Sequence, residues 1–154
     1  MKKLLFAASA MFLSLSALAG ISIYRGPNSS YRTIAYYENR TLYKGPNSSY
    51  RAFAYYEYGK FYAGSSSAYK CVACFESGRL YAGPSSAYKC VACYENGKIY
   101  AGSSSAYKCV FFYENGKLYR GPSSAYECVM SFSDDPSDAL VTFIAYYFYR
   151  GEFL

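Results

Sequence analysis

The sequence predicts an all-β protein built from tandem 19-residue β-hairpin repeats, arranged either as a closed propeller-like ring or as an open β-solenoid. Three observations predict this fold class. Tyrosine supplies 22 of 154 residues, glycine and serine separate the aromatic runs, and histidine and tryptophan are absent. Asn-Gly pairs suited to tight hairpin turns recur along the chain. A Tyr-x-Gly motif returns with a fixed period, and its tyrosines are Tyr24, Tyr43, Tyr62, Tyr81, Tyr100 and Tyr119.

The first residues, 1–19, predict a secretory signal peptide. Met1-Lys2-Lys3 is basic, residues 4–19 are mostly apolar, and Ala17-Leu18-Ala19 is a small-x-small cleavage motif. We expect cleavage after Ala19 and a periplasmic or secreted protein. The apolar run is short for a membrane-spanning helix, which needs about 20 residues. Residues 20–154 suit one β-hairpin repeat domain, with no spanning segment in the mature chain.

One repeat, residues 88–101, illustrates the expected hairpin. Residues 88–95 are rich in β-forming residues, Asn96-Gly97 is the favoured pair for a two-residue type I′ turn, and residues 98–101 form the second strand. This register places Glu95 opposite Lys98 and Cys93 opposite Tyr100. Strict alternation then assigns these side chains to the core face: Tyr88, Cys90, Ala92, Tyr94, Ile99 and Ala101.

The ends of the repeat region leave ring and solenoid open as alternatives. Residues 20–24 supply only the second strand of a repeat, and residues 143–147 resemble residues 52–56, which predicts a degenerate last hairpin copy. The lone first strand could pair with this last copy and close a ring, or both ends could cap an open stack. The Asn-Gly turns favour the ring, whereas the even number of cysteines favours the solenoid.

The Tyr/Gly hairpin repeat resembles two groups of bacterial exported proteins with short aromatic β-hairpin repeats. Its length and turn placement are similar to those of choline- and glucan-binding cell-wall modules, and Ile34-Ala35-Tyr36-Tyr37 is similar to the short strands of β-flower proteins. The resemblance covers the mature chain and implies a tandem-hairpin architecture. The tryptophans of the choline cage have no counterpart here, so choline binding is not implied.

The cysteines are candidate disulfide partners, because an exported protein meets an oxidising compartment. Pairing between neighbouring repeats would join Cys71 to Cys90, Cys74 to Cys93 and Cys109 to Cys128. Such bridges need adjacent equivalent strands, as in a solenoid, because bridged Cα atoms lie within about 7 Å. The two Cys-x-x-Cys motifs also match a zinc pattern. Residues i and i+3 of a regular strand point to opposite faces, so we predict no metal and no other cofactor.

The sequence predicts a non-enzymatic binding or structural protein. No histidine is available for a catalytic triad, and a Lys or Arg faces most of the glutamates beside the turns. Repeated weak sites suit a repetitive envelope glycan or a protein partner. With the neighbouring serines, the candidate binding surface consists of Tyr43, Tyr62, Tyr81, Tyr100 and Tyr119.

Charge and strand pattern bear on two other functions. The net charge of +6 is spread repeat by repeat, which predicts no nucleic-acid partner. The alternative to a binding function is self-assembly through edge strands, as in secreted functional amyloid. The acidic stretch from Asp134 to Asp138 predicts a polar turn rather than a calcium site.

Overall fold

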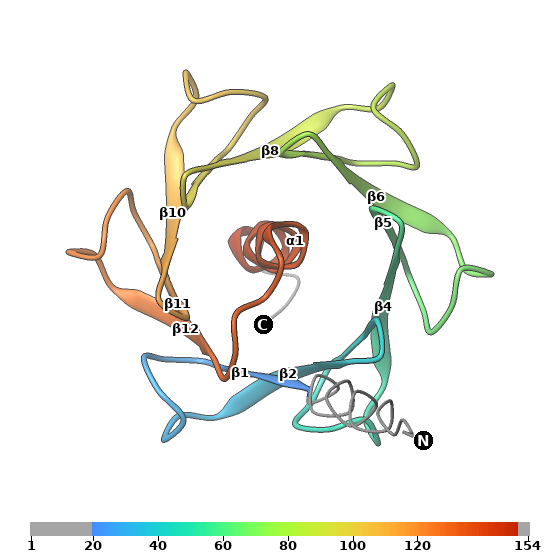
Figure 1. Cartoon of the computed structure of the whole chain (residues 1–154), viewed down its shortest axis with the longest axis horizontal. Coiled ribbons are helices and arrows are strands. Elements are labelled where there is room, and N and C mark those ends of the chain that lie inside the picture. Colours follow the sequence, from blue (N-terminus) through green and yellow to red (C-terminus); the bar gives the residue numbers. More distant parts are fainter. Residues whose placement is uncertain (1–19, 151–154) are drawn as a thin grey trace, which may run out of the picture.

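The computed structural model describes residues 20–150, so the expected signal peptide lies outside the described residues. Within residues 20–150, twelve antiparallel strands form one closed sheet with a single helix in its lumen (Figure 1). The elements are β1 (Ile21–Tyr24), β2 (Thr33–Glu38), β3 (Thr41–Tyr43), β4 (Ala52–Glu57), β5 (Lys60–Tyr62), β6 (Cys71–Glu76), β7 (Arg79–Tyr81), β8 (Cys90–Glu95), β9 (Lys98–Tyr100), β10 (Cys109–Glu114), β11 (Lys117–Tyr119), β12 (Cys128–Phe132) and α1 (Asp138–Tyr149). The closed-ring alternative is confirmed, and the open solenoid is wrong.

The tight turns form the hairpins that the sequence predicts. Asn96 and Gly97 have φ angles of 50° and 82°, as a type I′ turn requires. The expected pairs of Glu95 with Lys98 and of Cys93 with Tyr100 are both present. The first hairpin adopts the same conformation without glycine, because Arg40 takes a φ of 66°.

A β-bulge near the start of each long strand changes the face on which side chains lie. In β8, Leu80 pairs with Ala92 but Tyr81 pairs with Cys90, so Val91 is an extra residue between two ladder positions. Leu80 and Ala92 are buried in the lumen, and their neighbours in the ladder lie on the outer face. The same shift occurs at the start of β2, β4, β6, β10 and β12.

The bulge makes part of the predicted core face wrong. Ala92 and Ile99 are buried as expected, but Cys90 shares the outer face with its partner Tyr81. Tyr88 is 52% exposed, and Ala101 is exposed beyond the end of β9. Strict alternation failed because it allowed for no extra residue in the strand.

The first and last strands close the ring. Ile23 of β1 pairs with Phe132 of β12 on one side and with Ala35 of β2 on the other. The backbone N–H of Ser133 donates to Ser22 O at 2.9 Å, which extends this junction beyond β12. Strand β1, the lone second strand of a repeat, therefore completes the sheet.

The C-terminal segment is a helix, so the predicted degenerate hairpin copy is wrong. Residues 144–147 have the same sequence, Ile-Ala-Tyr-Tyr, as residues 34–37 of β2. Ser137 caps the helix by accepting a hydrogen bond from Leu140 N at 3.1 Å, and Asp138 lies in the first turn, where a negative charge is favourable. The sheet is already closed, so a further strand has no partner, whereas a helix satisfies its own backbone.

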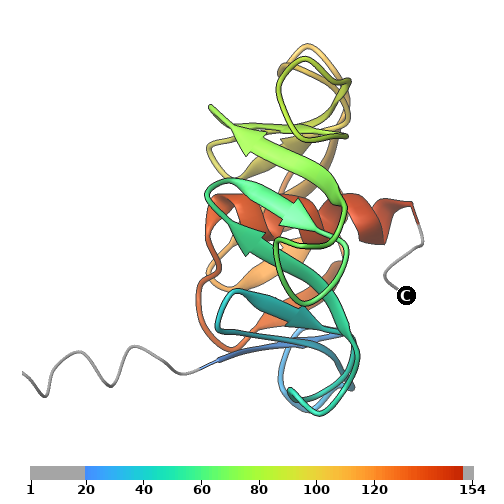
Figure 2. The same ribbon diagram turned by 90° about the vertical axis from the view of Figure 1, so that its right-hand side faces the viewer.

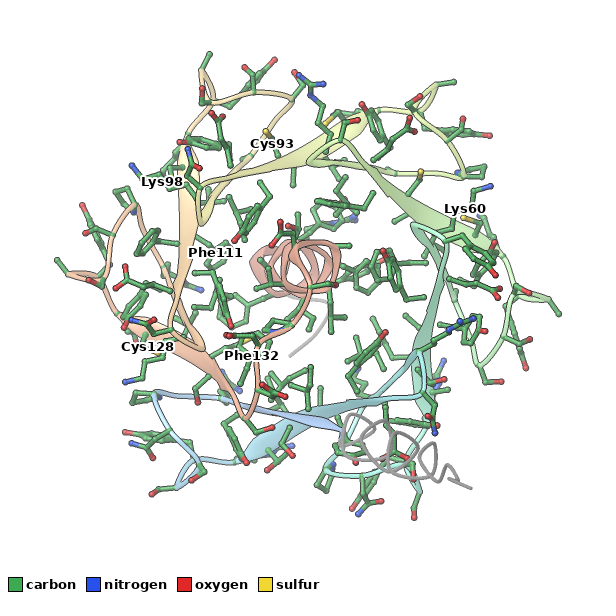
Figure 3. All side chains as sticks on the ribbon, in the orientation of Figure 1. Lys60, Cys93, Lys98, Phe111, Cys128 and Phe132 are labelled. Atoms are coloured by element: carbon green, nitrogen blue, oxygen red, sulfur yellow. The ribbon has the colours of Figure 1, made fainter. Side chains whose placement is uncertain are left out.

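Helix α1 fills the lumen along the ring axis and forms the centre of the core (Figure 2). Phe143 and Ile144 are fully buried. The Phe143 ring stacks on Phe61 of β5 with a centroid distance of 4.1 Å, and Phe148 meets Phe111 of β10 edge-on at 5.6 Å. Figure 3 shows Phe111 and Phe132 directed into the lumen and Cys93 directed outward. Within residues 20–150, no helix is long and apolar enough to cross a membrane.

We predict that Phe143→Ala lowers the free energy of unfolding by about 3–5 kcal/mol, because it leaves a cavity at the centre of the ring. Urea unfolding of the mature protein, followed by circular dichroism, measures this change. Ser48→Ala is the control, since the Ser48 side chain is exposed and its change should alter the free energy by less than about 0.5 kcal/mol. A loss below about 1 kcal/mol for Phe143→Ala would contradict the packing described here.

Candidate functional site

Six loops within residues 20–150 project outward from the ring and are called the petal loops: residues 25–32, 44–51, 63–70, 82–89, 101–108 and 120–127 (Figure 1). A backbone hydrogen bond closes the base of each loop, as from Ala82 N to Lys89 O at 2.9 Å. Inside the loop, Tyr88 N donates to Ser85 O at 3.2 Å, and the Ser85 hydroxyl accepts from Ala87 N at 3.3 Å. The petal loops are therefore ordered by their own backbone and by a serine side chain, or by Asn28 and Asn47 in the first two loops.

A tyrosine in each petal loop packs on the glycine that opens it. In residues 82–89, a Cβ atom on Gly83 would overlap the Tyr88 ring, although the φ of Gly83 lies outside the left-handed region. This glycine is therefore required by the close approach of the ring. These rings are about half exposed, and they belong to Tyr31, Tyr50, Tyr69, Tyr88, Tyr107 and Tyr126. The sequence analysis did not select these tyrosines, although each stands five residues after the repeat glycine.

The tyrosines that the sequence analysis selected lie on the outer wall of the ring. They are half-buried, and their set is Tyr43, Tyr62, Tyr81, Tyr100 and Tyr119. Each is flanked by a partner on both neighbouring strands; Tyr81, for example, lies between Cys74 of β6 and Cys90 of β8. Their role as a binding surface remains a prediction, and the petal tyrosines present more of each ring to solvent.

The cysteines occupy the outer wall in rows with these tyrosines. Cys90 and Cys93 lie on the same face, because the extra residue Val91 restores the phase between them. The expectation of opposite faces is therefore wrong. Cys74 and Cys90 are separated by the strand that carries Tyr81, which is about 10 Å at the usual strand spacing and beyond the reach of a disulfide.

All six cysteines lie in the described part of the chain, and all are free thiols. Burial raises the pKa of the thiols of Cys74 and Cys93, which disfavours the reactive thiolate. The Cys90 thiol donates to Ala92 O at 3.4 Å within its own strand. Among residues 20–150, no group of three or more His, Cys, Asp or Glu side chains is placed to hold a metal ion.

Exposed cations gather at one end of the ring, called the petal end, which the bases of the petal loops form around the C-terminal half of α1. Arg120 lies over the Phe148 ring at 5.3 Å, and Arg25, Arg120 and Phe148 line one hollow there. Glu127 is the one acidic residue in the petal-loop sequences. The exposed cations of this end are Arg25, Arg32, Lys44, Arg51, Lys70, Lys89, Lys108, Arg120 and Arg150.

Acidic side chains gather at the opposite end, called the turn end, which the hairpin turns form around the start of α1. Glu57, Glu76, Glu95 and Glu114 each pair across a turn with a Lys or Arg. Three aspartates precede or begin α1, and the Tyr113 hydroxyl donates to Asp135 at 2.7 Å. Burial, together with this hydrogen bond, raises the pKa of Tyr113 above its ordinary value. The petal end thus carries a clear excess of cations, whereas acidic and basic side chains are mixed at the turn end.

In the described part of the chain, three hollows lie at the petal end; two of them border α1, and the third lies between the first two petal loops. The largest of the three described here has a volume of about 730 Å³ and lies between Ala145 of α1 and strands β8 to β10. Two others, of about 500 and 590 Å³, lie beside Arg25. This end therefore combines exposed cations, tyrosine rings and concave surface, which are features of a binding surface.

Comparison with known proteins identifies one family. The model of a family described as 6-fold beta flower protein matches residues 23–144. No curated protein and no solved structure matches the chain significantly. The matched residues run from the second half of β1 through β12 to the first half of α1.

We predict that a thiol reagent labels all six cysteines after denaturation without a reductant, because the ring keeps possible partners apart. Mass spectrometry of the intact chain counts the labels, and a reduced sample is the control. The folded protein should react slowly at neutral pH, since burial raises the pKa of most of these thiols. Fewer than six labels without reductant, with peptides joining Cys71 to Cys90, would contradict the closed ring.

Proposed function

Because this chain belongs to the 6-fold β-flower family, we propose that it is an exported, non-catalytic protein that binds a repetitive anionic glycan of the cell envelope at its petal end. The observation that carries the proposal is the gathering of exposed Arg and Lys side chains around this end. A cationic surface of this kind attracts polyanions at long range and holds them by charge-assisted hydrogen bonds.

The six-fold repetition supports a polymeric ligand. Each petal loop offers at least one Arg or Lys beside a half-exposed tyrosine and serine hydroxyls. Weak equivalent contacts add up when the ligand repeats the same group along its length, because the second contact forms within an existing complex. Tyrosine and serine also supply hydrogen bonds that a hydroxyl-rich polymer can use.

Two features support a non-catalytic role. The sequence has no histidine, and the repeated glutamates lie at the turn end, where a Lys or Arg faces most of them across the turn. The thiols of Cys90 and Cys93 have pKa values raised by burial, which is unfavourable for a nucleophile.

Self-assembly through strand edges is the alternative function, and the closed sheet argues against it. Both edges of every strand in residues 20–150 are paired within the chain, since β1 bonds to β2 and to β12. Stacking of edge strands needs unpaired backbone groups. The closed ring therefore favours the binding function.

We predict that the triple variant Arg51→Ala, Lys70→Ala, Lys108→Ala weakens binding to polygalacturonate by at least about tenfold at low salt, as expected if the three cations together contribute about 1.4 kcal/mol. The matched control is Lys60→Ala, Lys98→Ala, Lys117→Ala, which removes the same charge from the turn end and should change affinity less than about threefold. Isothermal titration calorimetry measures both, and neutral dextran is the ligand control.

The proposal is contradicted if both triple variants weaken binding equally, or if polygalacturonate binds no better than dextran. Thioflavin-positive fibres from the purified mature protein under native conditions would instead support self-assembly.

A further inference from the structure

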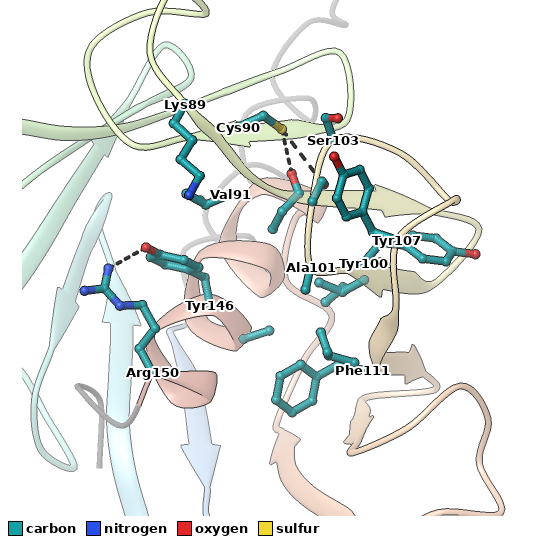
Figure 4. Close-up of a pocket in the computed structure, with 15 residues that line it drawn as sticks. Lys89, Cys90, Val91, Tyr100, Ala101, Ser103, Tyr107, Phe111, Tyr146 and Arg150 are labelled. Atoms are coloured by element: carbon teal, nitrogen blue, oxygen red, sulfur yellow. Dashed lines mark hydrogen bonds between the residues drawn. The ribbon is translucent and has the colours of Figure 1, made fainter.

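The hollow beside Ala145 differs in kind from the rest of the petal end. Its floor is apolar and is formed by Val91, Ile99, Val110 and Phe111 together with Ala145. Its volume of about 730 Å³ lies within the range of about 300–1,000 Å³ that is typical of small-molecule sites. Figure 4 shows the space between α1 and the strands that carry these residues.

Small residues stand at two repeat positions that line this hollow. The extra residue of the bulge is Phe53 in β4, where its ring packs against Tyr147 at 5.4 Å and fills the space beside α1. The equivalent residues in β8 and β10 are Val91 and Val110. The residue before the petal glycine is also small here. It is Ala101, whereas the equivalent residue of the next repeat, Arg120, covers Phe148. At Phe53 and Arg120, by contrast, the larger side chains of the equivalent positions pack on residues of α1.

Among the described residues, the two charged side chains that line this hollow are both basic. Lys89 from the base of one petal loop and Arg150 from the end of α1 line its mouth (Figure 4). The Arg150 guanidinium donates a hydrogen bond to the Tyr146 hydroxyl and lies 5.1 Å from the centroid of that ring, which fixes its position. No acidic side chain is among the residues that line this hollow in the described part of the chain.

We propose that this hollow is a binding site for a single-chain amphiphile with an anionic head group, of which a fatty carboxylate is the simplest example. The apolar floor takes the chain and removes its surface from water. Lys89 and Arg150 take the head group, because a guanidinium and an ammonium both form charge-assisted hydrogen bonds with a carboxylate. This site goes beyond the polymer-binding function, because it is one hollow beside α1 rather than a surface made of six equivalent petal loops.

The test is calorimetric titration of the mature protein with sodium dodecanoate below its micelle concentration. Dodecyltrimethylammonium, with the same chain and a cationic head, is the control ligand. We expect dodecanoate to bind and the cation to bind at least about tenfold more weakly. Two-dimensional NMR should show the largest amide shifts at Ala92, Ile99 and Val110. Equal binding of both amphiphiles, or shifts spread over the whole ring, would overturn the proposal.

Matched variants separate this site from general hydrophobic binding. Val91→Phe places in β8 the residue that β4 has naturally and should lower dodecanoate affinity at least about tenfold. Val72→Phe is the same substitution at the equivalent position of β6, outside the hollow. It should change the affinity for dodecanoate less than about twofold. Equal effects of the two variants would overturn the proposal.

A second pair of variants keeps the test decisive if Val91→Phe does not fold. Lys89→Ala should weaken dodecanoate binding at least about fivefold, whereas Lys70→Ala, at the equivalent position of the preceding petal loop, should not. Equal effects of these two changes would overturn the proposal. The triple variant Arg51→Ala, Lys70→Ala, Lys108→Ala should bind dodecanoate normally, so that failure of polymer binding and failure of this site are distinguishable.

Discussion

The antiparallel pairing of β1 with β12 is the interaction on which the rest of the structure depends. It joins strands that lie more than 100 residues apart in sequence and leaves no open edge in the sheet. Closure creates a lumen, and an empty lumen lined by Leu80, Ile99 and Phe111 would cost the contacts of many apolar side chains. Helix α1 fills this space, so the ring and its plug stabilise one another. The closed sheet therefore determines where the petal loops, the exposed cations and the hollows lie.

Closure of the ring also explains how a repeat with few charges produces a protein with a cationic end. A cation at one position of a repeat, such as Lys70 or Lys89, has no near neighbour of its kind in the sequence. The ring places the equivalent residues around one end, while the turn glutamates and the aspartates before α1 lie around the other. Six-fold repetition therefore converts a weak local preference into a surface suited to a polyanion. The bulge residue varies in size between repeats, from Phe53 in β4 to Val91 in β8, and the hollow beside Ala145 lies at Val91.

The features that could be predicted from the sequence are those that depend on residues close together in the chain. Asn96-Gly97 specifies its turn by backbone conformation alone, and the register of Glu95 with Lys98 follows from it. No residue near Val91 indicates the bulge in the sequence. Strict alternation therefore placed the Cys90 side chain on the wrong face of the sheet. The sequence Ile-Ala-Tyr-Tyr is a strand at residues 34–37 and a helix at 144–147, so its conformation is decided by the closed ring rather than by propensity. The Ser137 cap and Asp138 were the available signals for α1.

Hydrogen exchange of backbone amides tests most directly whether the ring and its helix form one cooperative unit. Exchange is measured by NMR on the mature protein as a function of low denaturant concentration, which separates local from global opening. Our account predicts that the slowest amides of β1, β12 and α1 exchange only through global unfolding, with the same free energy of opening as those of β7 and β9. Exchange of the α1 or β1 amides through a local opening of markedly lower free energy, while β7 and β9 stay protected, would contradict it.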